Sequence, residues 1–223
     1  MSDDKGEAVS TRDAVLNPVD RVSEALFGLF MALTFVGAVS VTEGPEGQVR
    51  SMFAAALGCN LAWGLVDAVM YLIRTVTDRG RLLTLIRTVR ADPDAESGRR
   101  LIERSISHVA AGLLSPAEIE AARGRILALT SVPSRPKLKG DDLLAALAIF
   151  LIVVASTFPV VLPFLLIPDV AIAKVVSRVL TLTMLFLGGL ALGRYAGYGS
   201  WRVGLLMAAL GTALIVAINA LGG

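Results

Sequence analysis

Charged residues are scarce in this chain of 223 residues. Asp, Glu, Lys and Arg make up 18% of it, whereas 55% of the residues are hydrophobic and the mean hydropathy is +0.70. Soluble domains carry about 25% charged and about 45–50% apolar residues. The composition therefore argues against a soluble globular protein. The single cysteine, Cys59, excludes an intrachain disulfide.

Motifs of enzyme sites are also missing. The sequence has one histidine, no zinc-ligand spacing, no phosphate-binding loop and no Ser/His/Asp set. We therefore expect a protein that is not an enzyme, has no cofactor and binds no nucleic acid.

Long apolar runs dominate what is present. Five blocks each reach the ~20 residues that a membrane-spanning helix needs. Lipid requires a helix, because backbone groups find no water partners there. The blocks are Val22–Val41, Met52–Ile73, Leu143–Ile167, Val170–Leu192 and Val203–Leu221. The predicted fold is all-α: a polytopic membrane protein with five transmembrane helices and a small cytoplasmic helical insert between helices 2 and 3.

These blocks divide the chain into four segments. They are a cytoplasmic N-terminal segment (1–21), transmembrane helices 1 and 2 (22–74), the insert (75–140) and transmembrane helices 3 to 5 (141–223). Of the 21 Lys and Arg residues, 18 fall in the N-terminal segment, in 74–139 or between the last two blocks. Cytoplasmic loops are rich in Lys and Arg. We therefore expect an integral protein of the bacterial inner membrane, with the N-terminus and insert cytoplasmic and the C-terminus outside.

The insert is rich in arginine and has helical periodicity. Residues 77–91 place Leu82 and Val89 on one face, which predicts an amphipathic basic helix. Ser115 and Glu118 have the spacing of a capping box at the start of a further helix. We expect two or three short helices that lie along anionic membrane lipids. A ligand-binding role is the alternative.

The second apolar block carries an amide and a carboxylate. Asn60 and Asp67 are two helical turns apart, so they share a face and lie about 10 Å apart along the axis. An ionisable group inside the bilayer is costly and usually faces the bundle interior or a wet cavity. We therefore interpret Asp67 as functional. The alternative is a protonated side chain that bonds a neighbouring helix.

The first block offers partners for these two residues. A short turn (42–50) suggests that helices 1 and 2 are antiparallel neighbours. The expected facing pairs are Glu24 with Met70, Gly28 with Asp67, and Thr34 with Asn60. Two carboxylates and a thioether favour Fe(II) or a similar ion over Mg(II). We predict an ion path lined by Glu24, Met31, Asn60, Asp67 and Met70, with Glu24, Asp67 and Met70 as the metal ligands.

Proline and glycine mark the later blocks. Pro159 and Pro163 each free a carbonyl four residues back and should bend the third helix. Small residues recur in the fourth and fifth blocks, which is typical of closely packed membrane helices. They are Gly188, Gly189, Gly193, Gly204 and Gly211. Either a helix pair within the chain or a homodimer interface would use them.

Two spans, a helical insert and three further spans form a pattern that resembles the vacuolar iron transporter family of divalent metal/proton exchangers. Three stretches carry the likeness best. They are "ASTFPVVLPFLLIP" (155–168), "LFLGGLALGRYAGYGSWRVGLLMAALGTALIVAINALGG" (185–223) and "GLLSPAEIEAARGRI" (112–126). The resemblance implies a homodimer with helix 1 near the symmetry axis and a metal path built from helices 1 and 2.

By position, Glu24 stands for the family's acid in helix 1, and Asp67 with Met70 for its acid and methionine in helix 2. The chain departs from the family where "SEALFG" (23–28) replaces Asn-Asp-Gly, and its insert has no close cluster of Glu residues. The function we expect is proton-coupled transport of a divalent metal ion, Fe²⁺ or Mn²⁺. The alternatives are a carrier of another solute, with Asp67 as proton relay, and a non-transporting membrane scaffold that binds lipid or a partner.

Overall fold

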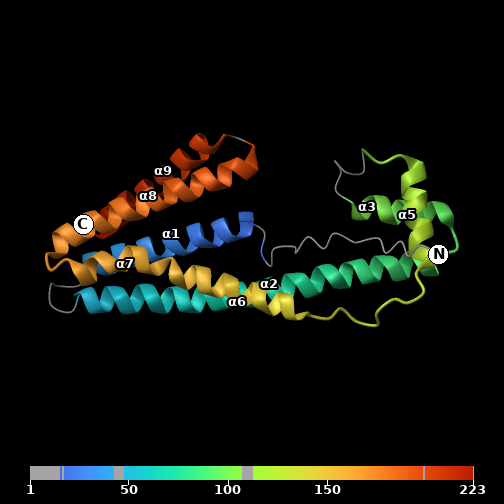
Figure 1. The fold of residues 1–223 in the computed structure, drawn as a ribbon, viewed down its shortest axis with the longest axis horizontal. Coiled ribbons are helices and arrows are strands. Elements are labelled where there is room, and N and C mark those ends of the chain that lie inside the picture. Colours follow the sequence, from blue (N-terminus) through green and yellow to red (C-terminus); the bar gives the residue numbers. More distant parts are fainter. Residues whose placement is uncertain (1–15, 17, 43–47, 107–112, 198, 223) are drawn as a thin grey trace, which may run out of the picture. The chain divides into compact units, whose positions relative to one another are not determined.

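The computed structural model describes residues 16, 18–42, 48–106, 113–197 and 199–222. Every regular element in these residues is a helix (Figure 1). The helices are α1 (Pro18–Thr42), α2 (Gln48–Ala91), α3 (Ala95–Ser105), α5 (Pro116–Ala128), α6 (Gly140–Ala155), α7 (Thr157–Leu166), α8 (Val170–Ala196) and α9 (Ser200–Gly222).

Five segments of the described residues are long and apolar enough to cross a membrane. They are Pro18–Val39, Val49–Ala91, Gly140–Leu166, Val170–Tyr195 and Ser200–Ala220. The predicted all-α membrane fold with five spans is thus confirmed. Two details differ from the prediction. The second helix continues to Ala91, and the third span consists of two helices, α6 and α7, that meet at Ser156.

The continuation of α2 has a simple cause. No proline occurs between Gln48 and Ala91, and Pro93 follows directly after the helix. A change from apolar to amphipathic sequence does not end a helix, because both patterns satisfy the same backbone bonds. The basic helix expected at 77–91 is therefore the last part of α2, and α3 and α5 are separate helices beyond it.

The chain divides into two compact units. The first is Met1–Val69 with Leu143–Gly223, and the second is Met70–Asp142. The first unit holds the larger hydrophobic core, which α1, α2, α7 and α8 build around buried side chains such as Leu29, Met52 and Val160. In this unit α1 packs against α7, α8 and α9.

Glycines bring α8 and α9 into close contact. A Cβ atom on Gly189 would lie 2.7 Å from the Cα atom of Gly204, and one on Gly193 would lie 2.6 Å from the Cα atom of Ser200. No side chain larger than hydrogen fits at either position without moving the backbone. Gly189, Gly193, Gly204 and Gly211 therefore pack α8 against α9 within the chain, whereas Gly188 faces Leu26 on α1.

The second unit has a smaller core of its own. Val89, Ile102 and Ile119 are buried together. Asp94 caps α3 by accepting hydrogen bonds from the backbone N–H groups of residues 96 and 97. The predicted capping box is present at the start of α5, where Ser115 and Glu118 bond each other's backbone N–H groups.

Candidate functional site

The side chain of Asn60 links three spans of the first unit. Its side chain is fully buried on α2, and its Nδ2 atom lies 3.1 Å from the carbonyl oxygen of Gly28 on α1. The same atom is 3.2 Å from the carbonyl oxygen of Val153 on α6 and 2.7 Å from Oγ1 of Thr157 on α7. One amide nitrogen therefore links the first, second and third spans at one level.

The orientation of this amide follows from its neighbours. The backbone oxygens of Gly28 and Val153 only accept hydrogen bonds, so the NH₂ group must face them. The other end of the amide, Oδ1 of Asn60, is buried and has no hydrogen-bond partner among the described residues. A buried carbonyl without a donor costs about 1–3 kcal/mol. The site therefore offers an oxygen that a donor or a cation would stabilise.

The break between α6 and α7 explains why Asn60 is needed there. The last four carbonyls of a helix lack intrahelical partners, and lipid supplies none. The carbonyl of Val153 receives the Ser156 hydroxyl at 2.7 Å as well as the Asn60 amide. Pro159, which has no N–H, follows three residues after the break. The expected interruption of the third span thus occurs at Ser156, and buried side chains replace the lost backbone bonds.

A glycine on α1 allows the helices to come this close. A Cβ atom on Gly28 would overlap Oγ of Ser156 and would lie 2.9 Å from the carbonyl oxygen of Val153. Gly64 on α2 is similarly tight, because its Cβ position is 3.2 Å from the carbonyl oxygen of Phe150. Both glycines let a backbone approach the α6–α7 junction.

The contacts of Asn60 fix how α1 and α2 are aligned. Asn60 bonds Gly28, and the rings of Phe27 and Trp63 meet edge to face, with their centroids 6.2 Å apart. The helices are therefore antiparallel, as predicted. The predicted pairing of Thr34 with Asn60 is wrong, because Asn60 lies opposite Gly28 and the hydroxyl of Thr34 donates to Phe30 O at 2.8 Å.

This alignment sets the levels of Glu24 and Asp67 along the bundle axis. Glu24 is four residues from Gly28, about 6 Å along the axis, and Asp67 is seven from Asn60, about 10 Å. Both offsets run toward the same end of the bundle, so Glu24 and Asp67 differ in level by about 4–5 Å. Gly28 is consequently opposite Asn60, and the predicted pairing of Gly28 with Asp67 is wrong as well.

The predicted ion-path residues have unequal environments. Glu24, Met31 and Asp67 are half-buried in the first unit, and Asn60 is fully buried. Met70 belongs to the second unit and is 45% exposed. Within the described part of the chain, no three His, Cys, Asp or Glu side chains gather closely enough to hold a metal ion.

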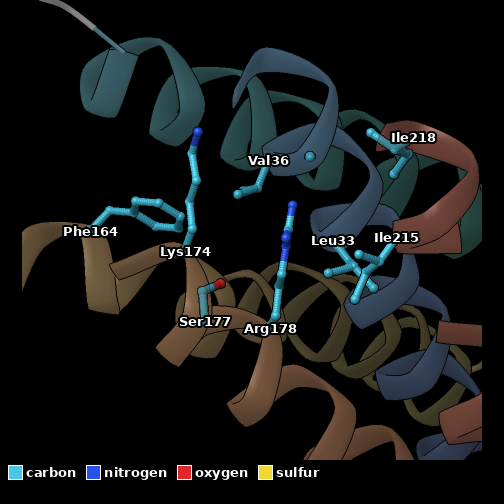
Figure 2. A pocket seen from close by; sticks show the side chains of 9 residues that line it. Leu33, Val36, Phe164, Lys174, Ser177, Arg178, Ile215 and Ile218 are labelled. Atoms are coloured by element: carbon cyan, nitrogen blue, oxygen red, sulfur yellow. The ribbon is translucent and has the colours of Figure 1, made fainter. Parts of the chain in front are cut away.

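A second polar feature lies at the opposite end of the first unit, where α1 and α9 end. Figure 2 shows a pocket in which Lys174 and Arg178 point from α8 toward the part of α1 that carries Val36. Sequence reasoning missed this pocket. The available signal was a pair of cations four residues apart inside an apolar span.

Ion pairs organise the second unit. Asp142 accepts two hydrogen bonds from the guanidinium of Arg79, at 2.6 and 2.7 Å, and one from the backbone N–H of Lys139 at 2.6 Å. On α5, Arg123 donates to Glu120 and lowers the pKa of that carboxyl. On α3, hydrogen bonds from Arg99 and Arg100 lower the pKa of Glu96. Glu96 on α3 and Glu120 on α5 thus pair with arginines.

No known family model and no curated protein matches this chain.

Proposed function

We propose that this protein is a proton-coupled carrier of a divalent metal ion of the Fe²⁺ or Mn²⁺ class. One observation carries the proposal: Glu24 and Asp67 are half-buried on neighbouring membrane helices and differ in level by about 4–5 Å. Carboxylates inside a membrane bundle are costly and are characteristic of ion pathways. Two of them together match the charge of a divalent cation.

The mechanism is competition between protons and the metal ion. With both acids protonated, the site is neutral and compatible with its apolar surroundings. A divalent ion displaces the two protons and restores neutrality as the dicarboxylate complex. Reprotonation from the other side of the membrane releases the ion. Met31 lies on α1 seven residues, about 10 Å, from Glu24. Its thioether is a soft donor that favours Fe²⁺ over Mg²⁺ farther along the path.

Asn60 gives the path a second position. Its unpartnered Oδ1 lies about 10 Å along α2 from Asp67. An amide oxygen is a hard ligand that suits a partly hydrated cation. An ion leaving the acids would meet this oxygen next, at the level where the third span is broken.

The resemblance of the span pattern to the vacuolar iron transporter family supports the same function. In that arrangement the N-terminus and the insert are cytoplasmic, the C-terminus is outside, and two copies form a homodimer around helix 1. A second copy would add a second Glu24–Asp67 pair. This matters because the described residues of one chain hold no cluster of three metal-binding acids, histidines or cysteines.

The proposal is tested in proteoliposomes that contain the full-length protein. We expect uptake of Mn²⁺ or Fe²⁺ that depends on a pH gradient and is lost in Asp67→Asn and Glu24→Gln. Asp20→Asn is the matched control, because it removes an exposed carboxylate from the first turn of the same helix α1. It should transport as the wild type does.

Two results would contradict the proposal. One is metal flux that persists at the wild-type rate in Asp67→Asn. The other is an equal loss of flux in Asp20→Asn, which would point to a general effect on α1. Circular dichroism and size-exclusion profiles of each variant establish that the helices remain folded.

A carrier of another solute, with Asp67 as proton relay, is the second candidate. It is favoured by the lack of three clustered metal-binding side chains among the described residues. Thermal unfolding with Fe²⁺, Mn²⁺, Co²⁺ and Zn²⁺ separates the two functions. A metal carrier is stabilised by at least one of these ions, because ligands that bind only the folded state raise the unfolding temperature.

A further inference from the structure

Part of the segment that joins α5 to α6 is bound along the last part of α2 (Figure 1). We call residues 133–139 the strap. Arg87 donates to the backbone carbonyls of residues 133 and 134, at 2.8 and 2.6 Å, and Arg79 donates to that of Lys137 at 2.7 Å. The two arginines are eight residues, about 12 Å, apart on α2. The strap is therefore held at two separate points through its backbone.

The side chains of the strap take no part in these bonds. Arg135, Lys137 and Lys139 alternate along it and are exposed. Among the described residues, none of these three side chains forms a hydrogen bond or an ion pair. The nearby acid Asp142 accepts two bonds from the guanidinium of Arg79 and one from the backbone N–H of Lys139. Three cations on a fixed backbone are thus available to a ligand.

The strap and α2 enclose a groove with an apolar floor. Its volume is about 380 Å³, which lies within the ~300–1,000 Å³ of small-molecule sites. The strap also packs on α2 at Gly80, where an added Cβ atom would meet the ring of Pro136 at 3.8 Å. Apolar and cationic side chains share the lining: Leu82, Leu83, Pro133 and Pro136 on the one hand, and Arg79, Arg135, Lys137 and Lys139 on the other.

The groove lies at the level where the third span begins. The strap ends at Lys139 and the span starts at Gly140, and the ion pair of Arg79 with Asp142 holds the start of α6 beside α2. Clusters of Lys and Arg directly beside a membrane-spanning helix attract anionic lipid headgroups. The topology given above puts this end of the span at the cytoplasmic leaflet, where anionic lipids are found.

We propose that this groove binds the headgroup of an anionic phospholipid. The phosphate accepts hydrogen bonds from Arg135, Lys137 and Lys139, and the upper part of the acyl chains contacts Leu82 and Leu83. An acidic peptide would satisfy the same cations, but the apolar floor and the adjoining span favour a lipid. The proposal rests on the proposed topology and is independent of metal transport.

Thermal unfolding of the full-length protein in neutral detergent tests the proposal. Phosphatidylglycerol should raise the unfolding temperature more than phosphatidylcholine does, and native mass spectrometry should show retained phosphatidylglycerol. The triple variant Arg135→Gln/Lys137→Gln/Lys139→Gln should bind phosphatidylglycerol roughly 100-fold more weakly, because each Lys or Arg near an anionic surface contributes about fivefold. Its fold should persist, since the strap is held through backbone atoms that the substitutions leave in place.

The matched control is Arg90→Gln/Arg104→Gln/Arg125→Gln. It removes the same charge from exposed positions of the second unit that do not line the groove, and it should keep the preference for phosphatidylglycerol. Equal stabilisation by both lipids, an unchanged preference in the strap variant, or an equal loss in the control would overturn the proposal. Equal stabilisation by inorganic phosphate, or tighter binding of polyglutamate, would overturn the lipid as the ligand. If the triple variant fails to fold, the three single variants decide the question by a fivefold loss each.

Discussion

Replacing Asn60 with leucine should destabilise the first unit by about 2 kcal/mol. The variant keeps the number and branching of the side-chain heavy atoms and removes the amide. It deletes three hydrogen bonds, to the carbonyls of Gly28 and Val153 and to the hydroxyl of Thr157. Hydrogen bonds between membrane helices average about 0.6 kcal/mol each, so three of them give about 2 kcal/mol.

Two opposing effects keep this figure from being larger. The carbonyl of Val153 retains the Ser156 hydroxyl as a donor at 2.7 Å, so it is not left bare. Removal of the unpartnered Oδ1 of Asn60 also relieves an unsatisfied acceptor. On the scale of globular domains of this length, a loss of 1 kcal/mol lowers the melting temperature by about 2–4 °C. We therefore expect Asn60→Leu to melt about 4–8 °C below the wild type.

The assay is thermal unfolding in detergent, followed by circular dichroism and by size-exclusion chromatography. Leu61→Ala is the control, because Leu61 neighbours Asn60 on α2 and is 41% exposed. This change should alter stability by less than about 0.5 kcal/mol. An Asn60→Leu protein that melts with the wild type would refute the view that this amide fastens the three spans.

Three further predictions concern packing and charge. Gly28→Ala should cost about 1–3 kcal/mol through overpacking at the α6–α7 junction, whereas Gly58→Ala, which meets no atom within 4 Å, should be neutral or stabilising in the same melting experiment. Arg79→Gln should leave Asp142 without its charged partner, and hydrogen exchange should then show faster exchange at the start of α6. Backbone and hydroxyl hydrogen bonds lower the pKa of Glu118 below its ordinary 4.5, so the start of α5 should lose protection as the pH falls through that lowered value, and Glu118→Gln should abolish this pH dependence.

The spans could be predicted from the sequence because they depend on a local quantity, the length of each apolar run. The capping box at Ser115 and Glu118 could be predicted for the same reason, since it needs only two residues three positions apart. The end of α2 could not be predicted from the apolar run, because the length of that run locates only the membrane boundary. The helix continues beyond this boundary to Ala91 and ends just before Pro93.

The candidate site depended on information that is not local. The sequence indicated that Asn60 and Asp67 share a face of one helix, but not which residues they oppose. That alignment is set by carbonyl groups at Gly28 and Val153, and the latter is 93 residues away from Asn60. Hydrophobic periodicity shows which side of a helix faces its neighbours. It does not show how far one helix is shifted along the axis of another.

The demand on position 60 limits how this protein can change over evolutionary time. Three acceptors converge on one buried point, and two of them are backbone atoms that no substitution elsewhere can alter. Among side chains of this size, only an asparagine supplies two N–H donors; glutamine is one methylene longer and aspartate has none. Relatives of this chain that keep the interrupted third span should therefore keep an asparagine here, even where their acids and their cargo have diverged.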